Sequence, residues 1–355
     1  MMNRVKHIDI AKGISISLVA MFHGQLKYFF PEIIEPMALF RMPLFFLLSG
    51  VFFSWAASPK DFLIKKSEAM LKPYFTILLL LLFIDFVSGD RDIAWQLKGI
   101  LYGNGDTISW SWRPLWFLTH LFVVYCFSYI LFRIVDFSEF SPITLSVILF
   151  LFMVLGSVGL DYFWYLEVQV FYQTLELPGL PFSLDIILIT CGYFILGRLL
   201  KFKIINFYPN LWTFILSIVI FLIISQFTNA HIDLNKRVYE YPIFATLGAI
   251  SGVYIIVSLS YFISKSYWLS FIPLSLGKAS IYILIFHSVI NHKSYTFFSS
   301  GVDDENTLIY LSFLSFGLSI FIPLMIKWVV ENNDVLSLAF LPFKSNKLIN
   351  RTKNS

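Results

Sequence analysis

The sequence predicts an all-α integral membrane protein of about ten transmembrane helices, with both termini in the cytoplasm. Hydrophobic residues make up 58% of the 355 residues, and charged residues only 14%, whereas soluble domains average about 25% charged residues. The apolar residues also fall in long runs, many close to the ~20 residues with which a helix crosses a bilayer. These observations exclude a soluble globular enzyme, a disordered protein and a nucleic-acid-binding protein.

Ten apolar runs are the predicted spans. Each must be a helix, because lipid offers no other way to satisfy the hydrogen bonds of the backbone. The first run is not expected to be a cleavable signal peptide, since it is too long and carries Lys12 and His23. We predict a membrane domain over 1–335 and a short basic cytoplasmic tail over 336–355. The runs are 8–28, 37–57, 72–88, 113–132, 142–160, 182–200, 211–228, 241–263, 272–291 and 307–330.

The basic residues predict the orientation. With the amino terminus inside, sixteen of the 26 Lys and Arg residues lie on the cytoplasmic side, seven lie in outer loops and three lie within spans. This bias is typical of membrane proteins in which the more basic side is cytoplasmic. The longest outer loops, 89–112 and 161–181, are long enough to form a lid or an acceptor surface.

Ionisable side chains within spans are the first candidates for function, because they are costly in a membrane. Lys12 and His23 are eleven residues apart, so on a helix they share one face within about 20° and lie about 16 Å apart. Asp9 can form an ion pair with Lys12. Lys12 could simply snorkel to the headgroups, and His23 could be an interfacial histidine. Together they favour a path with a phosphate-bearing donor at one end and proton transfer at the other.

Further ionisable residues lie in the second and ninth spans. Arg41 begins the second span and is expected either to snorkel or to face His23 across a short outer turn, where it would stabilise negative charge. In the ninth span, Lys278 and His287 are nine residues apart and therefore lie on opposite sides of a helix. Lys278 could snorkel, and His287 could be a packed polar residue at a helix interface.

The fourth span begins with an aromatic residue near the outer boundary. Trp116 is typical of the interfacial aromatic belt, and His120 lies one turn deeper on the same side. The sequence contains no glycine-rich phosphate loop, CxxC pair, HExxH motif or Gly-x-Ser-x-Gly elbow. The residues alone therefore fit either a transferase that takes a cytosolic anionic donor or a transporter with a proton relay.

Four segments, in order along the chain, carry a family resemblance. They are Ile8–Gly13 followed by His23, then Met42–Gly50, then Leu115–Leu118, and finally Leu276–Tyr282 leading to His287. Together they resemble the acyltransferase-3 family of integral membrane acyltransferases. The resemblance implies transfer of an acyl group, usually acetyl, from cytosolic acyl-CoA to a hydroxyl group. The acceptor would be a cell-surface glycan or its lipid-linked precursor.

The same resemblance implies roles for individual residues. His23 would be the general base, with Arg41 and His287 as further catalytic candidates, and Arg41 would stabilise an oxyanion. Donor binding would fall to Lys12. Apart from the resemblance, we also predict Lys278 as a donor-binding residue and Trp116 and His120 as acceptor-binding residues. The protein would lie in the bacterial inner (plasma) membrane among lipids, with acyl-CoA as donor and with no metal and no nucleic acid.

Two other functions stay open. A transporter or flippase for a lipid-linked saccharide would carry an inverted repeat with matched broken helices, and the sequence shows no such symmetry. A membrane subunit that only scaffolds a polysaccharide synthase would tolerate loss of His23 and Lys12.

Overall fold

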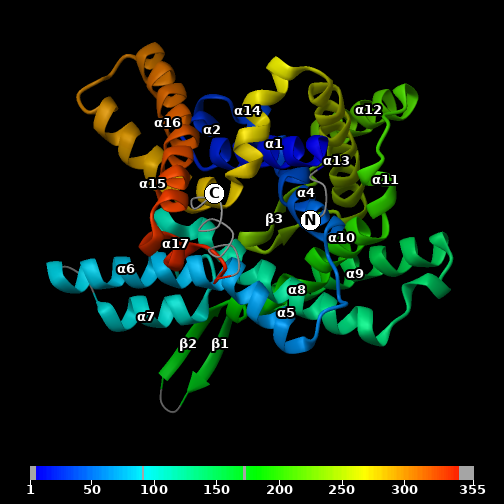
Figure 1. Ribbon diagram of the computed structural model, residues 1–355, viewed down its shortest axis with the longest axis horizontal. Helices are drawn as coiled ribbons and strands as arrows, with labels where there is room; N and C mark the ends of the chain where they lie inside the picture. Colours follow the sequence, from blue (N-terminus) through cyan, green and yellow to red (C-terminus); the bar gives the residue numbers. More distant parts are fainter. Residues whose placement is uncertain (1–4, 90–91, 171–172, 344–355) are drawn as a thin grey trace, which may run out of the picture. The chain divides into compact units, whose positions relative to one another are not determined.

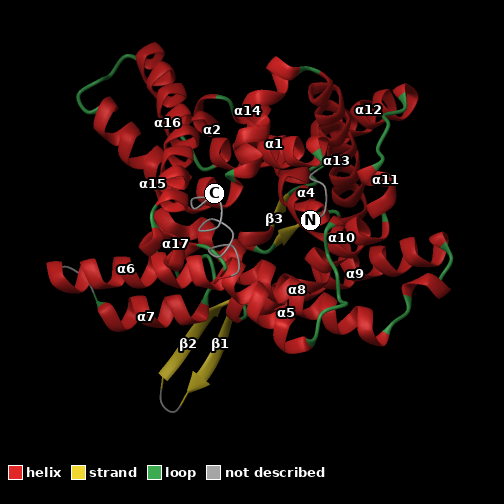
Figure 2. Cartoon of the chain, viewed as in Figure 1, coloured by secondary structure: helices red, strands yellow, loops and turns green. Residues whose placement is uncertain are grey.

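The computed structural model describes residues 5–89, 92–170 and 173–343, which are mostly helical (Figure 2). The α-helices are α1 (Lys6–Phe22), α2 (Leu26–Phe29), α3 (Pro31–Ile34), α4 (Ala38–Val51), α5 (Pro59–Lys66), α6 (Lys72–Ser88), α7 (Ile93–Tyr102), α8 (Trp116–Ile134), α9 (Pro142–Phe163), α10 (Ile187–Leu199), α11 (Lys201–Ile205), α12 (Leu211–Phe227), α13 (Pro242–Lys265), α14 (Tyr267–Lys278), α15 (Ser280–Ser299), α16 (Glu305–Asn332) and α17 (Asp334–Phe340). The shorter elements are η1 (Glu35–Met37), η2 (Ser67–Leu71, a π-helix), η3 (Trp110–Leu115), η4 (Phe137–Glu139), η5 (Pro181–Ile186), η6 (Leu234–Lys236), β1 (Trp164–Val170), β2 (Gln173–Pro178), β3 (Ile232–Asp233) and β4 (Val238–Tyr239).

Most of the predicted spans are helices of membrane-spanning length. Within the described residues, seven helical segments are long and apolar enough to cross, and the bent pair α14 and α15 makes up to eight. The predicted first and seventh spans correspond to α1 and α12, which have 17 residues each. Such helices are about 26 Å long, short of the ~30 Å hydrocarbon core. The chain is therefore a multi-pass, all-α membrane protein, whereas ten spans and cytoplasmic termini stay predictions.

The ninth predicted span, 272–291, is not one helix. Helix α14 ends at Lys278 and α15 begins at Ser280, with an 82° bend between them. Ala279, at the break, has φ −106° and ψ 9°, outside helical values. The sequence predicted one continuous helix because the apolar run continues through the break, and that prediction was wrong. Lys278 is therefore an exposed residue at the end of α14 and does not share a helix with His287.

The chain divides into two compact units. The first comprises Met1–Phe52, Ser146–Val158 and Leu188–Met325, and the second comprises Phe53–Leu145, Gly159–Ile187 and Ile326–Ser355. In the first unit, α1 packs against α4, α13, α14 and α15, and Figure 1 shows α1 in dark blue beside the yellow α14. Side chains from α1, α4, α11 and α13 form its apolar core. These are Ile8, Ala11, Phe40, Leu44, Leu47, Leu48, Val51, Ile204, Val253, Ile256 and Val257.

In the second unit, several helical segments pack on α6 and α8. Helix α8 contacts α5, η2 and η5, while α6 contacts α7 and α17. The Lys72 ammonium donates to the carbonyl of Leu341 (2.8 Å), so the first part of the predicted tail is ordered against α6. The basic residues Lys344 to Lys353, on which that tail was predicted, lie outside the described residues. The predicted outer loop 161–181 contains the antiparallel hairpin of β1 and β2.

Two glycines allow α1 and α14 to approach at backbone distance. A Cβ atom at Gly13 would overlap the carbonyl oxygen of Pro273, and one at Gly277 would overlap the carbonyl oxygen of Asp9. Small residues at helix interfaces permit this kind of contact in membranes. Both glycines belong to segments on which the family resemblance rests, so these two segments pack against each other.

We expect Gly13→Ala to destabilise the protein by about 1–3 kcal/mol, because the added methyl group must push two backbones apart. Gly317→Ala is the matched control, since it also lies within a helix but would meet no atom within 4 Å. That control should be neutral or stabilising by up to about 1 kcal/mol. The measurement is thermal unfolding of the purified protein in detergent. Equal melting temperatures for both variants would contradict the close contact.

Candidate functional site

Polar side chains from three helices meet in the first unit near the end of α1. His23 is the C-cap of α1 and is half-buried, and its ring centroid lies 5.4 Å from that of His287 on α15. Arg41 comes from α4, and Asn291 lies one turn beyond His287 on α15. His287 is fully buried, and Arg41 and Asn291 are 5% and 1% exposed. The structure therefore brings together the three predicted catalytic candidates and adds Asn291.

His287 is oriented by its own helix. Its Nδ1 lies 2.7 Å from the carbonyl oxygen of Ile283 and 3.0 Å from that of Leu284. Because carbonyl oxygens only accept hydrogen bonds, Nδ1 is the donor, and in the neutral ring Nε2 is then an acceptor. Nε2 is buried and has no hydrogen-bond partner among the described residues. The ring thus carries an unpaired base atom next to His23.

Arg41 is a buried cation without an ion pair in the described part of the chain. Its guanidinium carbon lies 3.7 Å from the centroid of the Phe22 ring, and the Phe22 ring in turn contacts that of His23. The Nη1 atom is buried and has no hydrogen-bond partner there. Asp233 interacts with Arg41 electrostatically but does not pair with it. A buried cation with an unused donor is suited to hold an anion or a developing negative charge.

Asn291 is the residue of this cluster that the sequence analysis missed. Both its amide nitrogen and its amide oxygen are buried without a hydrogen-bond partner in the described structure. Gly24, directly after His23, leaves space for this amide, because a Cβ there would lie 2.7 Å from the Asn291 nitrogen. The i, i+4 spacing from His287 was an available signal, but an amide carries no charge, so the cost of burying a charge in a membrane did not single it out.

The two predicted donor-binding lysines lie on segments in contact. Lys12 pairs with Asp9 at 4.0 Å, as predicted, and its ammonium lies 4.8 Å from the centroid of the Phe52 ring. Its side chain is 28% exposed, so a ligand can reach it. Lys278 follows Gly277, whose backbone touches α1 next to Lys12. The close contact of α1 and α14 therefore places two cation-bearing segments together.

Trp116 and His120 lie in the second unit and contact each other. Their ring centroids are 5.8 Å apart, both residues are buried, and Nδ1 of His120 lies 3.1 Å from the carbonyl oxygen of Phe182. Trp116 is only 5% exposed, so it is a packed residue of its unit. In the described ranges, no group of three or more His, Cys, Asp or Glu side chains is arranged to hold a metal ion.

The fold and the cluster define a multi-pass helical protein with paired imidazoles, a buried guanidinium and an unpaired amide. A profile of the acyltransferase-3 family, described as an acyltransferase domain, matches residues 5–328, nearly the whole chain. The chain belongs to this family, and the match supports a membrane acyltransferase. Neither a search of curated proteins nor a search of solved structures found a significant match.

Asn291→Leu should separate activity from stability. The replacement removes unpaired buried polar atoms, whose burial costs about 1–3 kcal/mol, so we expect the melting temperature to stay level or rise. Acyl transfer should fall at least about tenfold, a loss of roughly 1.4 kcal/mol in transition-state stabilisation. Ser294→Ala on the same helix is the control, because its hydroxyl only donates to α15 carbonyls. Full transfer by Asn291→Leu would show that the amide is structural only.

Proposed function

We propose that this protein transfers an acyl group, most simply acetyl, from cytosolic acyl-CoA to a hydroxyl of a cell-surface glycan or its lipid-linked precursor. The site would lie in the bacterial inner (plasma) membrane. The observation that carries the proposal is the contact of the half-buried His23 with the buried His287, beside the guanidinium of Arg41, whose Nη1 has no hydrogen-bond partner in the described chain. Family membership supports acyl transfer, and this cluster offers the groups that such a transfer needs.

In the proposed reaction, His23 is the general base. Its imidazole takes the proton of the acceptor hydroxyl as the oxygen attacks the thioester carbonyl carbon. Arg41 stabilises the negative charge on the carbonyl oxygen, where its buried position strengthens the interaction. The carbon–sulfur bond then breaks, and the departing CoA thiolate takes the proton from the imidazolium. The products are an ester and free CoA.

His287 and Asn291 would position the reacting groups. Since Nδ1 of His287 is bound to its own helix, its Nε2 is free to accept a hydrogen bond from His23 or from the acceptor hydroxyl. The Asn291 amide supplies a donor and an acceptor from the adjacent turn. Lys12 and Lys278 would bind the donor phosphates as point charges. Trp116 and His120 are buried in the second unit, so they would act on acceptor binding by positioning neighbouring groups and not by direct contact.

The deciding experiment compares surface glycans from a deletion strain complemented with wild type or with His23→Ala. Mass spectrometry would look for an ester that mild alkali removes, and the added mass would identify the acyl group. We expect His23→Ala to lose the ester, because removal of a general base costs about 10²–10⁴-fold in rate. His292→Ala is the control, since this histidine is exposed on the same helix as His287.

Normal esterification by His23→Ala at wild-type membrane level would overturn the assigned role of His23. One observation favours the transporter alternative, namely the broken helix pair α14 and α15. Transporters of this kind carry such breaks in matched pairs, and among the described residues one pair is bent in this way. An ester unchanged by deletion, with reduced glycan export, would identify a transporter.

A second prediction concerns the donor. Lys12→Ala should raise the KM for acyl-CoA about tenfold with a smaller effect on kcat, because a charge-assisted contact to phosphate is worth about 1.5–3 kcal/mol. Lys12→Arg keeps the charge and should remain within about threefold of wild type. The assay is acyl transfer by the purified protein at varied donor concentration. An unchanged KM in Lys12→Ala would identify Lys12 as a snorkelling residue.

A further inference from the structure

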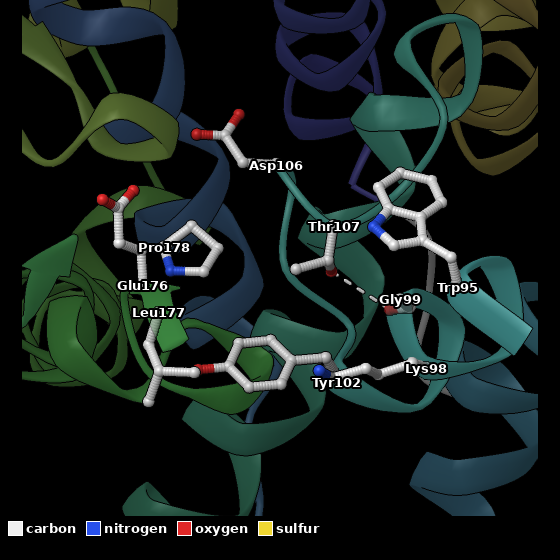
Figure 3. Close-up of a pocket in the computed structure, with 9 residues that line it drawn as sticks. All are labelled: Trp95, Lys98, Gly99, Tyr102, Asp106, Thr107, Glu176, Leu177 and Pro178. Carbon is white, nitrogen blue, oxygen red and sulfur yellow. Dashed lines mark hydrogen bonds between the residues drawn. The ribbon is translucent and has the colours of Figure 1, made fainter. Parts of the chain in front are cut away.

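A well-formed pocket lies within the second unit, between α7, the segment that follows it and β2 (Figure 3). Its cavity volume is about 200 Å³. In Figure 3, residues of α7 lie on one side and residues of β2 on the other. Both segments belong to the predicted outer loops 89–112 and 161–181. The lining residues are Trp95, Lys98, Gly99, Tyr102, Asp106, Thr107, Glu176, Leu177 and Pro178.

Hydrogen bonds hold the walls of this pocket in place. The Tyr102 hydroxyl donates to the carbonyl of Gly179 at 2.5 Å, and the Asn104 amide donates to the carbonyl of Pro178. The Thr107 hydroxyl donates to the carbonyl of Gly99 (3.1 Å), the bond drawn in Figure 3. These bonds tie the end of the hairpin to α7 and the loop after it. The pocket is therefore formed before any ligand arrives.

The side chains that remain for a ligand are of mixed chemistry. Trp95 is 55% exposed, and the side chains of Trp95, Lys98 and Glu176 form no hydrogen bond or ion pair within the described parts of the chain. Asp106 uses one carboxylate oxygen in an ion pair with Arg113 at 3.2 Å. The pocket thus offers a flat aromatic surface, an ammonium group and carboxylate oxygens.

This combination fits a sugar. A pyranose ring packs the C–H groups of one face on an indole, while its hydroxyl groups both donate and accept hydrogen bonds. A volume of about 200 Å³ is below the ~300 Å³ at which sites for drug-sized ligands begin, so the pocket suits one sugar ring and is too small for a CoA donor. The charges of Lys98 and Arg113 balance those of Asp106 and Glu176, which favours a neutral sugar.

We propose that this pocket binds one neutral pyranose unit of a saccharide. Trp95 stacks on the ring, Glu176 and Asp106 accept hydrogen bonds from its hydroxyls, and Lys98 donates to a ring or hydroxyl oxygen. The assignment of that saccharide as the acyl acceptor rests on the proposed function. The binding itself does not depend on acyl transfer, so the two ideas can fail separately.

The first test is direct binding. Oligosaccharides are released from the surface glycan of the producing strain, freed of esters with mild alkali, and added to the full chain in lipid nanodiscs. Saturation-transfer NMR then reads which sugar protons lie near the protein. We expect Trp95→Ala to reduce the transfer about fivefold or more and Trp95→Phe to retain most of it, because the phenyl ring still stacks. Trp110→Ala is the control, since Trp110 has a similar exposure of 53% but lies outside the pocket.

The second test uses acyl transfer to the same oligosaccharides. We expect Trp95→Ala to raise the KM for the saccharide roughly tenfold and Glu176→Gln to raise it about fivefold, with kcat within about twofold of wild type. Wild-type binding and KM in Trp95→Ala would overturn the proposal. The proposal would also be overturned if the amount of protein in the membrane fell equally in Trp95→Ala and Trp110→Ala. That result would identify both tryptophans as interfacial anchors. Binding without transfer by wild type would support the sugar pocket and reject the proposed enzymatic function.

Discussion

The approach of α1 and α14 at Gly13 and Gly277 is the constraint on which the first unit depends. Because the two backbones touch there, α14 is fixed against the part of α1 that carries Lys12. One residue after Lys278 the chain bends by 82° into α15, which contacts α1 again and places His287 beside His23. The bent pair of α14 and α15 therefore contacts α1 near Lys12 and again near His23. The glycine contact between α1 and α14 brings the segments of Lys12 and Lys278 together. The bend after Lys278 then brings His287 to His23.

The cluster around His23 is costly for the fold. Nη1 of Arg41, Nε2 of His287 and the Asn291 amide are buried without partners among the described residues, and each such group costs about 1–3 kcal/mol. Apolar side chains of similar size would pack there without this cost. Groups that break local rules of stability in this way are typical of functional sites. Phe22 offsets part of the cost for Arg41 through its ring face.

The local features of this structure were predictable from sequence, and the long-range ones were not. The apolar runs predicted the helices, and the spacing of Asp9 and Lys12 predicted their ion pair, because both depend on neighbours along one helix. The break at Ala279 was missed, since the apolar pattern continues through it and the bend is visible only once the packing of α14 is known. The contact of His23 with His287 joins residues far apart in the sequence. The pocket at Trp95 forms where two predicted outer loops pack against each other, and hydrophobic periodicity does not predict how loops pack.

The separation of the sugar pocket from the spans has an evolutionary consequence. Its lining residues come from α7, the loop after it and β2, and none comes from a segment of membrane-spanning length in the described chain. Loops tolerate insertion and substitution better than packed helices do. A lineage could therefore change which sugar it recognises by altering these loops, while the helices that carry His23, Arg41 and His287 remain untouched. The recognised glycan could then diversify while the catalytic residues stay the same.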